Sequence, residues 1–286
     1  MKNKLFYVIL VVIFLAGLSL VLYPTISNLY NSYLQSQSIA KYSQEIDRLE
    51  EEEVRTQLSL AREYNRALTE RKNPYVLTDE LSSLYNTLLS STSQGIFAYV
   101  EIPSIDVMLP IARGTDEDVL KDKVGHLEWS SLPVGGENTH AVISAHRGLP
   151  SSELFTNIDH LELGDEFYIH ILGETLKYQV CNVAIVEPDD QRLLRVEEKQ
   201  DLVTLVTCTP YGINSHRLLV RGVRVGTAGG TADPELSVKN EITAVDPWIL
   251  VAAILVTLSV LTFLFVLFGG KQNRKKGTKT NETRDP

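Results

Sequence analysis

Cys208 stands where an apolar, β-branched run ends, and Arg217 lies at the start of the next such run. The Thr-Pro-Tyr-Gly segment between them indicates a loop that joins two strands. Antiparallel pairing of these strands would bring the thiol close to the guanidinium. A fixed positive charge favours the thiolate and can stabilise an oxyanion. The pattern therefore predicts a cysteine nucleophile beside an oxyanion-binding arginine.

A catalytic cysteine usually needs an imidazole nearby to move protons. Of six histidines, His146 ends the run THAVISAH and enters a Gly/Pro loop, where barrels often place site chemistry. His140 begins that run, and His216 is nearest to Cys208 in sequence. Neighbouring strand residues point to opposite faces, so His216 and Arg217 cannot both face the thiol. The residues favour His146 and leave His140 and His216 as alternatives.

Short alternating apolar segments separated by turn residues begin at Ile96. They are the strand–turn–strand FAYVEIPSIDVMLPIA and residues 139–145, 166–172, 175–186, 202–208 and 217–225. Such a series predicts a closed or nearly closed all-β barrel. Before it, apolar residues at helical spacing predict an amphipathic helix over 34–72, which Asn73-Pro74 ends, and a shorter helix over 78–93.

Two apolar runs, Leu5–Tyr23 and Trp248–Phe268, are each long enough to cross the ~30 Å hydrocarbon core as a helix. The first has the basic start of a signal peptide, but no convincing cleavage site follows, which favours an uncleaved anchor. Basic residues flank the outer ends, namely Lys2, Lys4, Lys271, Arg274, Lys275, Lys276 and Lys279. The positive-inside rule then predicts two transmembrane helices, cytoplasmic termini and an extracellular domain.

The chain has a net charge of −9 and no basic patch of the kind that binds nucleic acid, so a nucleic-acid partner is not expected. The chain has no Walker or dinucleotide glycine pattern and no metal-ligand spacing, so neither a cofactor nor a metal is expected. Its two cysteines, Cys181 and Cys208, could form one disulfide. A disulfide-dependent extracellular fold would carry more cysteines, so we expect Cys181 to be a small buried residue of a strand.

The run TLVTC with Arg217 after it resembles the TLxTC…R signature of the sortases, the cysteine transpeptidases of Gram-positive cell surfaces. The longer run TLVTCTPYGINSHRLLVRG is similar to the class C, pilin-polymerising branch. Supporting matches are GHLEWSSLPVGG at 125–136, ISAHRGLP at 143–150, LFTNIDHLELGDEFYIHILGETLKYQV at 154–180 and VEPDD at 186–190. The similarity covers about residues 96 to 225. One departure is Ala145, where the family usually has glycine.

The resemblance implies an eight-stranded sortase β-barrel. Cys208 would be the nucleophile, His146 the proton donor and acceptor, and Arg217 the oxyanion- or substrate-orienting group. The implied reaction cleaves an LPxTG-like sorting signal through a thioacyl enzyme and transfers it to a lysine of a pilin subunit. The alternatives are anchoring of surface proteins to peptidoglycan, or a non-catalytic pilus-assembly module.

Class C sortases often carry a lid with an Asp-Pro-aromatic motif that covers the cysteine. Asp246-Pro247-Trp248 opens the second apolar run, which is the wrong place for that lid. The positional match is Asn73, Pro74 and Tyr75. Asparagine lacks the charge that could pair with Arg217, so the resemblance implies a weaker lid in which Tyr75 still covers the thiol. The alternative is that Asn73-Pro74 simply ends a helix.

These patterns divide the chain into consecutive segments with distinct roles. We expect an N-terminal transmembrane anchor over 1–24, a helical stalk with the lid over 25–95, the catalytic barrel over 96–226, a linker over 227–246, a second transmembrane helix over 247–269 and a basic cytoplasmic tail over 270–286.

Overall fold

The computed structural model describes residues 2–90, 92, 95–226 and 256. The chain divides into two compact units, one of residues 1–26 with 239–286 and the other of residues 27–238. The predicted linker, second transmembrane helix and basic tail lie outside the described residues, apart from Val256. Those segment boundaries therefore stay predictions.

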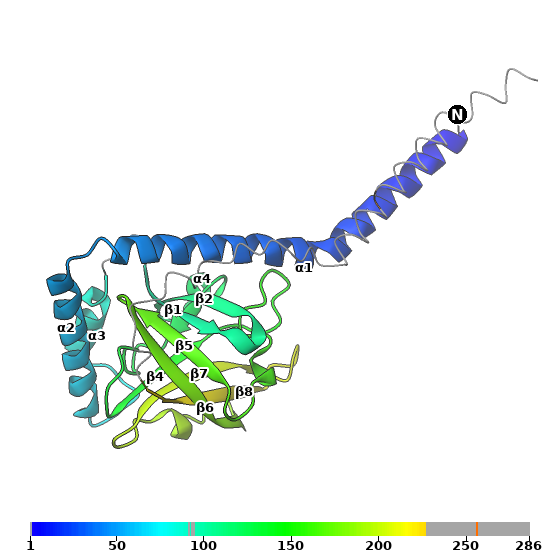
Figure 1. Ribbon diagram of the computed structural model, residues 1–286. Helices are drawn as coiled ribbons and strands as arrows, with labels where there is room; N and C mark the ends of the chain where they lie inside the picture. The colour runs from blue at the N-terminus through cyan, green and yellow to red at the C-terminus, as the bar shows by residue number, and fades with distance from the viewer. Residues whose placement is uncertain (1, 91, 93–94, 227–255, 257–286) are drawn as a thin grey trace, which may run out of the picture. The chain divides into compact units, whose positions relative to one another are not determined.

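Eight strands close into a barrel, as the sequence and its family resemblance predicted (Figure 1). They are β1 (Ile96–Ile102), β2 (Val107–Arg113), β3 (Val124–His126), β4 (Thr139–Ser144), β5 (Glu166–Ile171), β6 (Glu174–Val186), β7 (Asp201–Thr209) and β8 (His216–Arg224). Their order around the barrel is β1-β2-β3-β4-β7-β8-β6-β5, and β5 pairs with β1. The β2–β3 and β4–β7 pairs are parallel and the others antiparallel. The short strand β3 was not predicted.

Large apolar side chains fill the barrel interior, among them the fully buried Phe97, Phe167 and Tyr178. The Phe167 ring packs against the backbone of Gly222 on β8, where a Cβ atom would lie 2.4 Å from it. Glycine at this position therefore lets an aromatic ring approach the strand that carries Arg217. Short helical turns join the strands: η1 (Pro103–Ile105), α4 (Glu117–Leu120), η2 (Ile158–His160) and η3 (Arg192–Leu194).

Three helices precede the barrel: α1 (Lys2–Ile46), which continues through Pro24, α2 (Glu51–Thr69) and α3 (Asp79–Thr87). By length and composition α1 could cross a membrane, with a mean hydropathy of 3.0 in its apolar part. The helix predicted over 34–72 is wrong as a single element, because the chain turns at residues 47–50. The apolar spacing from Ile46 to Leu49 continues across this turn, so periodicity could not reveal it.

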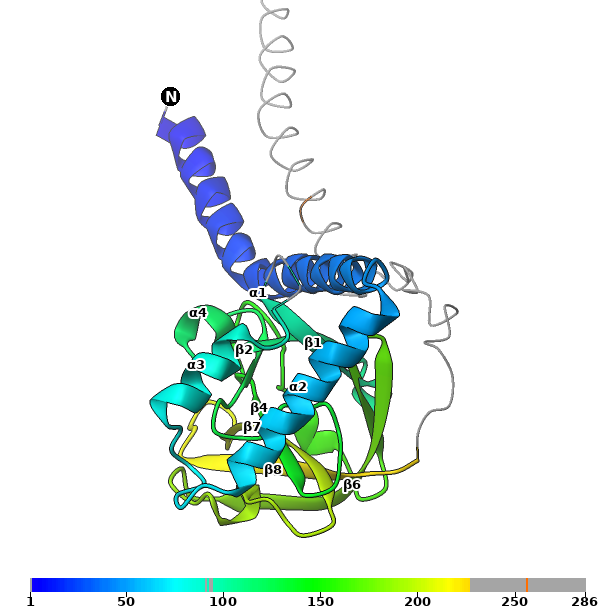
Figure 2. The same cartoon turned by 90° about the vertical axis from the view of Figure 1, so that its left-hand side faces the viewer.

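Helices α2 and α3 lie next to each other on one side of the barrel (Figures 1 and 2). Asn65 of α2 is buried and holds the loop between β3 and β4, because its side-chain amide accepts from Leu132 N at 2.8 Å and donates to Leu132 O at 2.9 Å. At the end of α1, Tyr42 Oη donates to Phe97 O and accepts from Leu172 N, both at 2.8 Å. The helical layer is therefore tied to the barrel by buried hydrogen bonds.

Asn65→Leu should destabilise the protein by about 1–3 kcal/mol, because it leaves the buried N–H of Leu132 without a partner. The Leu132 carbonyl loses one of its two hydrogen bonds and keeps the one from Val134 N at 2.8 Å. The measurement is chemical denaturation of the whole chain in detergent micelles. Asn86→Leu is the matched control: this asparagine is exposed and bonds locally to Ser82 O, so its loss should change stability by less than about 0.5 kcal/mol. Equal effects of the two substitutions would contradict the expectation.

Candidate active site

Cys208 and Arg217 are directly opposite each other on the antiparallel strands β7 and β8. Side chains of directly opposed residues stand on the same face of a sheet, with Cβ atoms about 4.5–5.5 Å apart. The Arg217 guanidinium is oriented by its own strand and loop, since Nη1 donates to His216 O at 3.2 Å and to Asn214 O at 3.4 Å. The expected pairing of thiol and guanidinium therefore follows from the hairpin register.

His146 reaches the same place through the parallel pairing of β4 with β7. Ser144 is paired with Val206, and the ladder continues with Ala145 N donating to Val206 O at 3.1 Å. His146 and Cys208 each lie two residues further on, so their side chains point to the same face of the sheet as those of Ser144 and Val206. The imidazole and the thiol thus leave neighbouring strands at the same end and on the same face.

Cys208, His146 and Arg217 line one cavity of about 330 Å³. Its floor is apolar, because the same face of the sheet carries a small hydrophobic cluster separate from the barrel interior, made of Val142, Leu194, Val206 and Leu219. Polar and aromatic groups complete the walls, among them Trp129, Asp190 and Gln191. The three predicted residues therefore sit at the polar end of an apolar groove outside the barrel core.

The other two candidate histidines are engaged elsewhere. His140 is buried, with Nδ1 2.7 Å from Arg195 O and Nε2 2.7 Å from Thr204 Oγ1, and burial lowers its pKa to about 4. His216 lines a different hollow, where its Nε2 lies 3.3 Å from a carboxylate oxygen of Glu187. Of the three, His146 is the one that shares a cavity with the thiol.

The predicted lid segment lies next to this cavity, against its Trp129 wall. Asn73 Oδ1 accepts from Tyr75 N at 3.0 Å, which forms a local turn. Tyr75 packs edge-on against Trp129, with ring centroids 5.2 Å apart, and its hydroxyl donates to Gln191 O at 3.1 Å. Asn73, Pro74 and Tyr75 do not line the Cys208 cavity, whereas Trp129 and Gln191 do.

Trp129 is a wall residue that the sequence analysis did not single out, although it stands within the matched segment GHLEWSSLPVGG. Helix α2 and the segment after it hold its loop: Tyr64 Oη donates to Glu128 O at 3.3 Å, and Arg71 Nη2 donates to Trp129 O at 2.7 Å. An aromatic side chain in a polar loop was the available signal, but its wall position depends on contacts made by distant helices.

Both cysteines are free. The expectation that Cys181 is buried is wrong, because it is exposed at a β-bulge where the β6–β8 register shifts between Val180 and Asn182. The extra residue of a bulge leaves the regular alternation of a strand, so a pattern of apolar neighbours cannot place it. Cys181 takes no part in the Cys208 cavity.

Comparison with known proteins places this geometry in a family. Residues 100–225 match the model of the sortase domain. A sortase C structure from Streptococcus pneumoniae, reported for catalysis and pilin substrate specificity, is 42% identical with a TM-score of 0.59, over 66% of this chain and 97% of that one. Sortase C from Clostridium perfringens, with the C-terminal cell wall sorting motif, is 44% identical with a TM-score of 0.59, over 67% and 99%.

The chain belongs to the sortase family. Sortases are cysteine transpeptidases, and the similarity to sortase C structures confirms the class C resemblance inferred from the motifs. Sortase D of Bacillus subtilis is 33% identical over 129 residues, which is 44% of this chain and 62% of that protein. The matched sortase domain contains Cys208, His146 and Arg217, whereas α2 and the lid segment precede it.

Stability of this sortase should fall as the pH is lowered from about 6.5 towards 4. Burial lowers the pKa of both His126 and His140 from 6.5 to about 4, so in this window the unfolded chain binds protons that the folded chain does not. Each histidine contributes a slope of up to about 1.4 kcal/mol per pH unit.

Denaturation of the whole chain in detergent between pH 4 and 7 measures this slope. His140→Gln should remove about one proton from the uptake on unfolding, so its stability should depend less steeply on pH than that of the wild type. A His140→Gln variant with an unchanged slope would contradict the assignment.

Proposed function

We propose that this sortase cleaves an LPxTG-like sorting signal through a thioacyl enzyme and transfers the new carboxyl end to a lysine amine of a pilin subunit. The observation that carries the proposal is the shared cavity of Cys208, His146 and Arg217 on one face of three paired strands. We further propose the topology expected from the charges, with both termini cytoplasmic and the barrel outside.

In the first step, the Cys208 thiolate attacks the carbonyl carbon of the threonine that precedes glycine in the signal. Arg217 opposes the cysteine on β8 and stabilises the oxyanion, since a guanidinium keeps its charge at physiological pH. Collapse of this intermediate breaks the carbon–nitrogen bond, and His146 gives a proton to the departing glycine amine. The products are a thioester on Cys208 and a free glycine-ended peptide.

In the second step, the lysine amine attacks the thioester carbonyl and His146 accepts its proton. The carbon–sulfur bond breaks, Cys208 leaves as a thiolate, and an isopeptide bond joins the two subunits. The apolar floor of the cavity suits the leucine and proline of a sorting signal. The similarity of this chain to sortase C structures, one of them reported for pilin substrate specificity, favours a pilin acceptor over peptidoglycan.

Whole wild-type chain in detergent, incubated with a pilin that carries both the signal and an acceptor lysine, should form SDS-resistant ladders. Cys208→Ala should abolish them, and Arg217→Gln should lower kcat by about 10²–10³-fold through loss of oxyanion stabilisation. His216→Ala is the control and should remain near wild type, because that ring faces another hollow. A ladder that persists in Cys208→Ala, or cleavage without any ladder, would overturn the polymerase assignment.

We also propose that Tyr75 restrains access to Cys208 through Trp129. Tyr75→Ala removes the ring that packs on this wall, so alkylation of Cys208 by a bulky maleimide should accelerate several-fold. Tyr75→Phe keeps the ring contact and loses the hydroxyl bond to Gln191, so it should stay closer to wild type. The assay needs a Cys181→Ser background, since that thiol is exposed. An unchanged rate in Tyr75→Ala would end the lid proposal.

A further inference from the structure

The surroundings of the His146 ring differ from those of a typical catalytic triad. Within the described part of the chain, no hydrogen bond or ion pair reaches either ring nitrogen of His146. Cysteine and serine nucleophiles commonly rely on a third group that holds the base in place. Where the imidazole lies therefore depends on how the backbone of its own segment is held.

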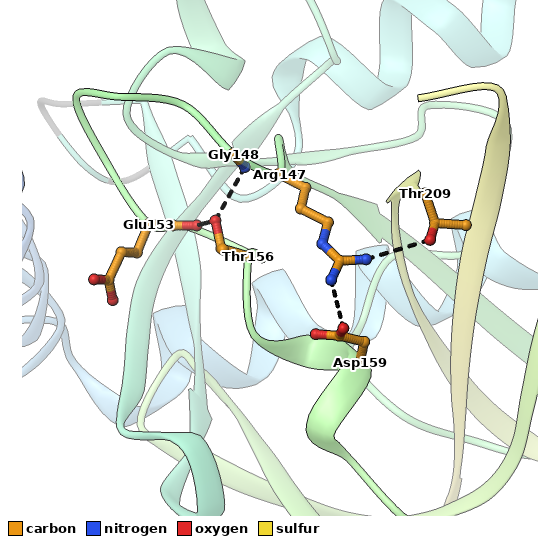
Figure 3. A network of polar contacts seen from close by, with 6 residues as sticks. All are labelled: Arg147, Gly148, Glu153, Thr156, Asp159 and Thr209. Atoms are coloured by element: carbon orange, nitrogen blue, oxygen red, sulfur yellow. Dashed lines mark hydrogen bonds and ion pairs between the residues drawn. The ribbon is translucent and has the colours of Figure 1, made fainter. Parts of the chain in front are cut away.

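That backbone is fixed on both sides of the histidine. On one side, Thr207 Oγ1 donates to Ala145 O at 2.8 Å, which ties the segment to β7. On the other, Gly148 N donates to Thr156 Oγ1 at 3.1 Å, and this threonine hydroxyl donates to Glu153 O (Figure 3). The histidine's own carbonyl accepts from Phe155 N at 3.2 Å.

Arg147 adds a direct link to the strand of the nucleophile. Its guanidinium donates to Thr209 Oγ1 at 3.3 Å and forms an ion pair with Asp159 of η2 (Figure 3). Arg147 follows His146 in the chain and Thr209 follows Cys208, so this one side chain joins the residues next to the base and next to the thiol.

The arginine is held here at an energetic cost. Its side chain is 10% exposed, and its Nε is buried without a hydrogen-bond partner among the described residues. A buried guanidinium with an unpaired N–H destabilises the fold unless its other contacts compensate. Asp159 neutralises the charge, and the remaining contact is the one to Thr209. What the arginine gains at this position, besides neutralisation by Asp159, is therefore its hydrogen bond to Thr209 on β7.

We propose that Arg147 is a positioning residue that holds the His146 imidazole against the Cys208 thiol by tying the His146 segment to Thr209, with Asp159 fixing the guanidinium. The inference rests on the proposed function of His146 and Cys208. Arg147 is not among the residues that line the cavity, so it acts through its neighbours and does not touch substrate. Its loss should impair proton transfer while leaving peptide binding largely intact.

The test uses the whole chain in detergent with a Cys181→Ser background and an LPxTG peptide. Arg147→Met should lower kcat about 10- to 100-fold with KM within about threefold, because small displacements of reacting groups cost this much. Thr209→Val should lower kcat in the same direction. The double variant should be no slower than Arg147→Met alone, since both changes remove one contact.

Arg221→Met is the matched control. Arg221 has the same side-chain exposure, 10%, and pairs with a carboxylate, Glu197, but stands away from the Cys208 cavity. It should lose stability comparably and keep kcat. Equal losses of kcat in the two arginine variants, or a wild-type kcat in folded Arg147→Met, would overturn the inference. If Arg147→Met does not fold, the kcat of Thr209→Val tests the inference instead, because this substitution removes only the hydroxyl that Arg147 contacts.

A second readout separates this inference from the proposed reaction. The pH dependence of Cys208 alkylation by iodoacetamide reports the neighbouring imidazole without any peptide. Arg147→Met should move this profile towards that of His146→Ala. A wild-type profile in Arg147→Met, or identical profiles in wild type and His146→Ala, would refute the positioning role. If the wild type does not turn over the peptide, the proposed function is refuted, and the alkylation profile alone then tests the role of Arg147.

Discussion

Strand β7 pairs with β4 on one side and with β8 on the other, and the geometry of the site follows from these two registers. The parallel pair carries His146 towards Cys208, and the antiparallel pair sets Arg217 opposite it. A slip of one residue in either pair would turn the reacting side chain to the opposite face of the sheet. Burial on both faces prevents such a slip: Val203 and Leu205 belong to the barrel core, while Val206 belongs to the outer cluster.

The same two-sided burial explains what could be predicted from the sequence. A strand covered on both faces appears as a continuous apolar run, so LVTLVTC located β7 and the thiol at its end. The hairpin after it and the strand that ends at His146 were also encoded locally. The run could not show which face is the barrel interior, because both faces are apolar. Membership of the family supplied the choice among His140, His146 and His216 that the residues left open.

What could not be predicted depends on contacts between distant segments. The turn at 47–50 preserves apolar spacing, and Cys181 is exposed because the register of β6 shifts there. Ala145, which replaces the usual glycine, is accommodated because its backbone is outside the left-handed region and its methyl group is buried with the main core. Arg147 and Trp129 each lie in recognisable motifs, yet their partners are distant in the chain. Arg147 contacts residues 12 and 62 positions away, and Trp129 contacts residues 54 and 58 positions away.

The reacting residues and the walls of the cavity are held by different parts of this sortase. Cys208 and Arg217 stand in the β7–β8 ladder and His146 follows the end of β4, so their spacing depends on strands that belong to the barrel. Trp129 and Gln191 come from loops, and both contact Tyr75, which precedes the sortase domain. A change in the helices before residue 96 can therefore reshape the groove without moving the thiol, the imidazole or the guanidinium. In the proposed mechanism the barrel fixes the reacting residues, whereas the segment between α2 and α3 acts on access to them through the contact of Tyr75 with Trp129.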